Sequence, residues 1–253
     1  MNRETNIARF EAELARIHRH GIDKLMAFIR KSDFYTAPAS TRFHLSCEGG
    51  LLQHSLNVLD AMRCMMTKES DGLDESGNPK IKYHYTVAGQ TVATIPEESL
   101  IIIALLHDIC KTYFYTTSTR NVKNEKTGKW EKAPFYTVSD KMPLGHGAKS
   151  AMIVKQYIEL TTPEMYAIWW HMGFTDATDT RTLTQAIEQY PIILAAHTAD
   201  MMASSFMEGE KGNRENFIPA TGSDEGQAGE YADAPPTEDD AAEFQEVIPY
   251  ATV

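Results

Sequence analysis

Histidine and aspartate side chains recur along this chain inside segments that are otherwise apolar or helix-forming. The residues that could bind a metal through nitrogen or oxygen are His54, His107, Asp108, His146, His171 and Asp200. A single buried histidine is more often a hydrogen-bonded core residue than a metal ligand. Six such residues spread over separate segments favour a shared site, so the sequence predicts a metal centre and an enzyme.

The residue types indicate which metals fit. Asp108 follows the apolar run ALLH, where an ionised carboxylate is costly unless a counter-charge lies close to it. Imidazole combined with carboxylate suits the borderline transition metals Mn, Fe, Co, Ni and Zn, whereas Mg, the less suited alternative, more often binds carboxylates and water. The expected cofactor is therefore one or two divalent transition metals.

These candidate ligands lie in segments that are predicted to be helices. Helical spacing of apolar residues is found over 7–28, 51–66 and 146–160. Pro96 and the two glutamates after it are typical of a helix start, because proline fits the first turn and acids favour the positive end of the helix dipole. The following run, IIIALLHDICK, is apolar on nearly all sides, which predicts a central buried helix.

Two further helices are predicted to carry the last ligands. A helix capped by Thr162 and stopped by Gly173 places His171 in its last turn. A final helix over 191–207 places Asp200 in its middle. Helices that pack around a common core can each direct one polar residue into a shared pocket.

The expected fold class is mainly α, because strand-like alternation is confined to two short stretches. These predict small β-hairpin insertions near 80–95 and 113–139 in a helical body over 1–207. Residues 208–253 hold twelve Asp/Glu and two Lys/Arg, a net charge of −10 out of −11 for the chain. This stretch has the composition of an acidic, flexible tail, and it leaves the body near −1.

Composition also restricts location and partners. Three cysteines without a CxxC pair indicate no disulfide framework, and they favour a reducing cytoplasm. The longest apolar run, Leu100–Leu106, is far shorter than the roughly 20 residues that cross a bilayer, so no membrane partner is expected. A near-neutral body without a basic stripe does not favour extended nucleic acid. The oligomeric state is left open.

The order of four candidate ligands along the chain resembles the H…HD…D signature of the HD-domain superfamily: His54, then His107-Asp108, then Asp200. Members of this superfamily share a helical fold, and most are metal-dependent phosphohydrolases. The phrases TAPASTRFH, EGGLLQHSLNV, ALLHDICK and PLGHGAKSAMI further resemble HD-domain proteins encoded by phages and bacteria. The resemblance covers roughly residues 30–207 and implies a helical HD-domain bundle.

The resemblance implies that one metal is bound by the residues His54, His107, Asp108 and Asp200. Asp108 would bridge to a second metal, held by His146 and His171. In several two-metal members a second histidine follows the residue that matches His171, whereas here that position is Met172.

The implied catalytic residues are Asp108 and Lys111, of which Lys111 would contact a substrate phosphate. Arg42 and Lys149 lie next to motif segments and are further candidates for substrate binding. His197 is a candidate ligand or partner because it lies on the same helical face as Asp200. The remaining histidines are expected on the surface or behind the ligands: His18, His20, His44 and His84.

The implied reaction is hydrolysis of a phosphate ester or anhydride by metal-activated water. A nucleotide or a related phosphorylated small molecule is the preferred substrate, and RNA ends also belong to the class on which the superfamily acts. Two alternatives stay open at this point. One is a di-iron oxygenase of a small molecule built on the same fold, and the other is a non-catalytic, metal-stabilised module that senses a ligand.

Overall fold

The computed structural model of the chain describes residues 2–73, 77, 79–124, 128–175 and 179–208. This part of the chain holds eight α-helices and five β-strands, and the strands form two separate antiparallel sheets. The predicted class, mainly α with one or two small hairpins, is therefore wrong, and the fold is mixed α/β. The predicted acidic tail lies outside the described residues except for its first residue, Glu208.

Three strands lie between α3 and α4 and two between α4 and α5, whereas the other helices are joined by loops and turns. Their bounds are α1 (Arg3–Leu14), α2 (Ile22–Lys31), α3 (Gly50–Met65), α4 (Glu97–Leu106), α5 (His146–Lys155), α6 (Thr162–Trp169), α7 (Thr180–Gln189) and α8 (Ile192–Met202). A 3₁₀ turn, Ile109–Lys111, follows α4, and a π-helical turn, Ala203–Met207, continues α8. Among the described helices, only α7 was not predicted from the sequence.

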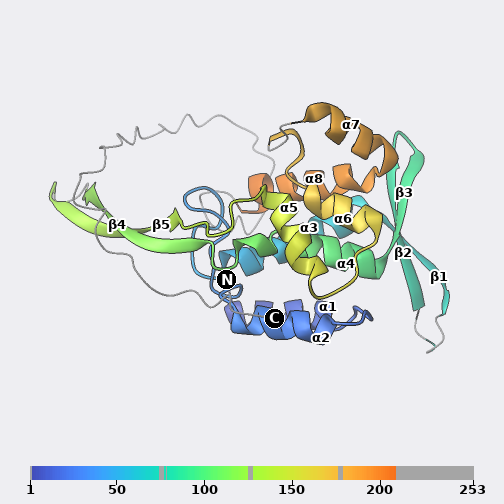
Figure 1. The fold of residues 1–253 in the computed structure, drawn as a ribbon, viewed down its shortest axis with the longest axis horizontal. Coiled ribbons are helices and arrows are strands. Elements are labelled where there is room, and N and C mark those ends of the chain that lie inside the picture. Colours follow the sequence, from blue (N-terminus) through green and yellow to red (C-terminus); the bar gives the residue numbers. More distant parts are fainter. Residues whose placement is uncertain (1, 74–76, 78, 125–127, 176–178, 209–253) are drawn as a thin grey trace, which may run out of the picture. The chain divides into compact units, whose positions relative to one another are not determined.

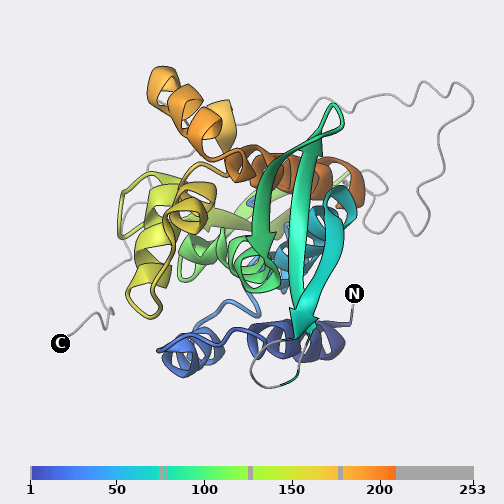
Figure 2. The same ribbon diagram turned by 90° about the vertical axis from the view of Figure 1, so that its right-hand side faces the viewer.

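Helix α4 forms the centre of the core, as its apolar sequence predicts. Every residue from Ser99 to Leu106 is buried, and each fully buried Leu or Ile side chain contributes about 1.5–3 kcal/mol to stability. Helices α3 and α6 pack on α4, and α8 packs on both of them. Figures 1 and 2 show α3, α4, α6 and α8 gathered together. This packing brings together the ends and faces that carry the predicted ligands.

A very close contact fixes α5 against α6. A Cβ atom added at Gly147 would lie 2.0 Å from the carbonyl oxygen of Trp169 and 2.8 Å from that of Ile168. Only glycine allows the two helices to approach this closely. Because Gly147 follows His146, the contact also holds the start of α5 near the end of α6.

The strands flank the helical core rather than forming its centre. The first sheet has the order β1-β2-β3, with β1 (Thr67–Leu73), β2 (Pro79–Val87) and β3 (Gln90–Pro96). The second is a two-stranded ribbon of β4 (Tyr115–Lys123) and β5 (Trp130–Val138), which extends away from the helices in Figure 1. Strand β1 lies outside the predicted hairpins, because all its residues are exposed and leave no alternating pattern.

None of the helices in the described ranges combines the length and the apolar character needed to span a membrane.

Candidate metal centre

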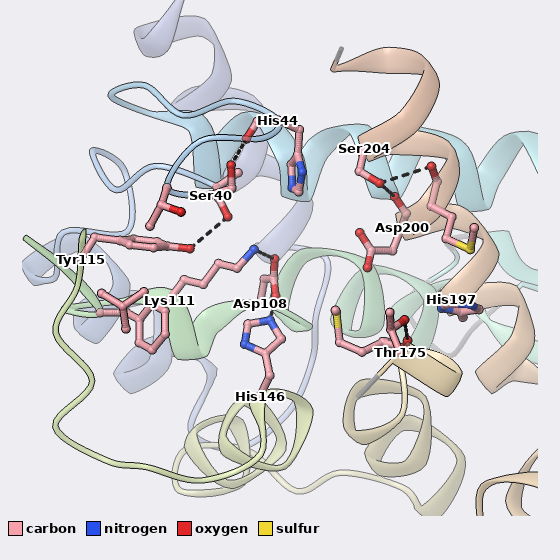
Figure 3. Close-up of a pocket in the computed structure, with 16 residues that line it drawn as sticks. Ser40, His44, Asp108, Lys111, Tyr115, His146, Thr175, His197, Asp200 and Ser204 are labelled. Carbon is pink, nitrogen blue, oxygen red and sulfur yellow. Dashed lines mark hydrogen bonds and ion pairs between the residues drawn. The ribbon is translucent and has the colours of Figure 1, made fainter. Parts of the chain in front are cut away.

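The six predicted ligands converge from different elements. They come from α3 (His54), the end of α4 (His107 and Asp108), the start of α5 (His146), the turn after α6 (His171) and α8 (Asp200). Helix α6 ends at Trp169, so His171 lies beyond the last helical turn where it was predicted. Figure 3 shows Asp108 between Lys111 and His146, with Asp200 facing the same space.

The first group of ligand atoms surrounds the Nε2 atom of His54. This nitrogen lies 3.2 Å from Nε2 of His107, 3.2 Å from Oδ1 of Asp200 and 3.4 Å from Oδ2 of Asp108. Ligand atoms that bind one metal at about 2.0–2.2 Å lie about 3 Å from one another. The spacing of this group therefore fits a single cation.

The second group uses the other oxygen of the same carboxylate. Oδ1 of Asp108 lies 2.6 Å from Nε2 of His146 and 3.5 Å from Nε2 of His171. Its Oδ2 atom faces the first group. The two oxygens of Asp108 thus point to different sets of imidazoles, which is the arrangement that a bridging carboxylate requires.

Hydrogen bonds on the far side of each ring show why a cation suits the centre. Nδ1 of His107 donates to the carbonyl oxygen of Ala104 at 2.8 Å, and Nδ1 of His171 donates to that of Ile168 at 2.7 Å. In the neutral form of each ring these bonds place the proton on Nδ1 and leave Nε2 as an acceptor. Among the described residues, Nε2 of His171 is buried without a hydrogen-bond partner. Lone pairs that converge in a buried space are stabilised by a metal ion.

A carboxylate missed by the sequence prediction fixes the ring of His54. Glu208 is buried, its two oxygens lie 3.1 and 3.0 Å from Nδ1 of His54, and it accepts a hydrogen bond from Asn57 at 2.8 Å. A carboxylate on the far nitrogen orients a metal-binding histidine and raises its basicity. The sequence hid this role, since Glu208 begins the acidic stretch and is separated from His54 by more than 150 residues.

His44 and Cys110 also lie beside the centre. The ring of His44, half-buried, lies 5.1 Å from that of His54, so of its two expected places, the surface or behind the ligands, His44 takes the second. Sγ of Cys110 lies 3.0 Å from Nδ1 of His146, and burial raises the pKa of this thiol to about 12. Buried groups of histidine, aspartate, glutamate and cysteine that could hold a metal ion are therefore present.

Charge in the centre is concentrated on Asp108 and Lys111. Their side chains form a buried ion pair with an Nζ–Oδ2 distance of 2.7 Å. Burial alone would raise the pKa of Asp108, but Lys111 and the surrounding histidines outweigh it and hold that pKa well below its usual range. Burial lowers the pKa of Lys111, and Asp108 more than restores it, so Lys111 stays cationic. Burial lowers the pKa of His107 to about 3, so its ring is neutral and available as a ligand.

A pocket of about 360 Å³ opens onto Asp108, Lys111, His146 and Asp200. Its other walls include Ser40, His44, Tyr115, Met172, Thr175 and His197. Figure 3 shows Tyr115 and Lys111 on one side of this space and His197 and Thr175 on the other. Met172, which follows His171, thus contributes to the wall of the pocket.

Of the three basic residues that were predicted to bind substrate, only Lys111 is among the residues that line the pocket. Lys149 is buried beside it, with its Nζ atom 2.6 Å from Oδ1 of Asp140 and over the ring of Phe114. Arg42 is exposed and lies against its neighbour Phe43. His197 donates through Nδ1 to the carbonyl oxygen of His171 at 2.7 Å, so it positions that ligand's backbone.

We expect Glu208→Gln to weaken metal binding about 10- to 100-fold, because the neutral amide no longer raises the basicity of His54. Titration of the metal-free protein with Mn²⁺, followed by calorimetry, measures this change. Glu188→Gln, an exposed glutamate on α7, is the matched control and should bind as the wild type does. Equal affinities in all three proteins would show that Glu208 does not act on the centre.

Compared with protein-family models, curated proteins and solved structures, the chain shows no match. The resemblance to HD-domain proteins therefore depends on the order of the motif residues alone.

Proposed function

We propose that this protein is a metal-dependent phosphohydrolase of the HD-domain type, which cleaves a phosphate ester or anhydride of a nucleotide or a related phosphorylated small molecule. The observation that carries the proposal is the position of Asp108. Its carboxylate lies between two groups of imidazoles at the base of a pocket, and the buried cation Lys111 lines the same pocket.

Two bound divalent cations supply a water of lowered pKa and a positive field for the attacking and leaving oxygens. The chain's own residues would hold the substrate. An ammonium group has three N–H donors, so Lys111 can donate to a phosphoryl oxygen while it keeps its contact with Asp108. This lysine would position the phosphoryl group beside the ligand cluster.

The remaining walls favour a substrate with a flat apolar part. The ring of Tyr115 and the side chains of Val138 and Met172 line the pocket, and the hydroxyl group of Tyr115 donates to the carbonyl oxygen of Ala39 at 3.2 Å. That hydrogen bond holds the ring in place. Sites for small ligands are mostly apolar and commonly exceed about 300 Å³, so a nucleobase or a comparable ring fits here.

We expect Lys111→Met to lower kcat/KM for phosphate release about 10- to 100-fold, because a charge-assisted hydrogen bond to the substrate is lost. Steady-state assays with the Mn²⁺-loaded protein measure this change. Lys141→Met, which removes an exposed lysine, is the control and should retain wild-type kcat/KM. An unchanged value for Lys111→Met would remove this lysine from the substrate site.

A panel of nucleoside monophosphates, nucleoside triphosphates and an aryl phosphodiester tests the reaction class. The proposal expects phosphate release from at least one member of the panel with Mn²⁺, Fe²⁺ or Co²⁺. No release from any member, together with oxygen consumption by the iron-loaded protein, would overturn it in favour of an oxygenase.

A further inference from the structure

The ribbon of β4 and β5 is a separate feature that the proposed hydrolysis does not use. The two strands pair in register from Tyr115 opposite Val138 to Lys123 opposite Trp130. In Figure 1 the ribbon extends clear of the helices. Eight residue steps at about 3.3 Å each give it a length of roughly 26 Å.

One face of this ribbon combines cations with aromatic rings. Residues that pair directly share a face, and alternate pairs point the same way. The face that begins with Tyr115 and Val138 at the pocket therefore continues outward with Tyr136, Lys132, Lys123 and Trp130. We call this set the ribbon face. It joins the pocket directly, because its first pair belongs to the pocket wall.

Both charged residues of the ribbon face are lysines. This face carries no acidic residue along the described strands, whereas the opposite face holds one cation, Arg120, and one acid, Glu131. Within the described part of the chain, neither Lys123 nor Lys132 has an ion-pair partner, and both are exposed. This cationic surface belongs to a body whose overall charge is near zero. The net charge of the body therefore gives no indication of this cationic surface.

Trp130 is the second unusual feature of the ribbon face. Its side chain is 68% exposed at the outer end of β5, beside Lys123 in the pairing. An indole ring left in water costs free energy that burial in a core would recover, so exposed tryptophans often mark binding surfaces. Sites for single-stranded nucleic acid combine aromatic rings with cations, since bases stack on the rings and phosphates pair with the cations.

We propose that the ribbon face binds single-stranded nucleic acid and guides the strand along β4 and β5 to the pocket. Trp130 and Tyr136 stack on bases, and Lys123 and Lys132 pair with phosphates. The occupant is a polyanion with flat rings, which matches the charge and the aromatic content of the face. This inference concerns binding, so it holds independently of hydrolysis in the pocket.

Fluorescence anisotropy with labelled oligo(dT) and oligo(U) tests the proposal on the full chain, with a gel to check that the strand stays intact. Trp130→Ala should weaken binding at least about fivefold, because one stacking contact is lost. The salt dependence is measured as the slope of the logarithm of the binding constant against the logarithm of the salt concentration. Replacing both Lys123 and Lys132 by glutamine should reduce the magnitude of this slope by about 1.4.

Lys68→Gln with Lys80→Gln is the matched control, because it removes two exposed lysines from the other sheet. It should leave the salt slope and the affinity nearly unchanged. An equal loss in this control would overturn the proposal, and so would the absence of binding by the wild type. A different result would assign the ribbon face to a second copy of the chain. In that case the wild type would self-associate as its concentration rises but would not bind the oligonucleotide, and Trp130→Ala would abolish the self-association.

Discussion

We expect Asp108→Asn to lower phosphate release at least about 10³-fold, the largest effect of any single substitution in this chain. Its two oxygens face different groups of imidazoles, so one change would remove a ligand from both of the proposed metal positions. Asparagine preserves the shape of the side chain but removes its negative charge. It also leaves Lys111 buried without its partner, which further opposes a cation at the centre.

Asp140→Asn is the matched control for this prediction. Asp140 also pairs with a buried lysine, since its Oδ1 atom lies 2.6 Å from Nζ of Lys149, but it does not line the pocket. Activity assays on both variants, with circular dichroism to confirm folding, separate loss of the centre from loss of an ion pair. Equal activity in Asp108→Asn and the wild type would refute the assigned role of Asp108.

We expect Glu164→Gln to destabilise the fold by about 3 kcal/mol, because it breaks a buried ion pair. The Glu164 side chain is 1% exposed, and it accepts two hydrogen bonds of 2.6 Å from Arg19. It also accepts from Ser99 on α4 at 2.5 Å and from the backbone of Thr161 at 2.8 Å. Glutamine can keep the helix cap but cannot pair with the guanidinium group. Denaturation with urea measures the change.

The same pair predicts how stability depends on pH. Burial raises the pKa of Glu164, but hydrogen bonds from Arg19 and Ser99 outweigh this effect, so its pKa lies below the ordinary value. The stabilisation is therefore present above about pH 4.3 and is lost as pH falls through the lowered pKa. The difference in stability between the wild type and Glu164→Gln should shrink at acidic pH.

Glu11→Gln is the exposed counterpart of this substitution. Glu11 also accepts two hydrogen bonds from one arginine, Arg30, but the side chains are 28% and 50% exposed. Because water screens an exposed pair, Glu11→Gln should destabilise the fold much less than Glu164→Gln does. If the two variants lost equal stability, burial would not be what makes the Arg19–Glu164 pair important.

Local patterns in the sequence predicted much of the helical core and the ligands attached to it. Helix α3 begins at Gly50, one residue before the predicted start, and Glu97 begins α4 as the proline and acids before the apolar run indicate. These signals succeed because caps and apolar spacing act within a few residues of one another. The six candidate ligands were found for the same reason, since each lies in a strongly patterned segment.

Features that depend on distant contacts were missed. Glu208 supports His54 only because the turn after α8 returns to α3, and nothing near Glu208 in the sequence indicates this. Strand β1 pairs with β2 through its backbone while all its side chains face water, so no apolar pattern reveals it. The mixed α/β class was therefore beyond what periodicity could predict.

The ribbon face illustrates a related difficulty. The sequence argued against extended nucleic acid, because the charge of the body averages to nearly zero. Pairing of β4 with β5 places Lys123 and Lys132 together on one face, and it places Glu131 on the other face with Arg120. Which charged residues share a face is known only after the register of the strands is known.

The most direct test of the central claim is the metal content of the purified protein, measured by mass spectrometry for the wild type and Asp108→Asn. The account predicts at least one equivalent of a divalent transition metal per chain in the wild type and almost none in the variant, with Asp140→Asn unchanged. Equal metal content in the wild type and Asp108→Asn would contradict it.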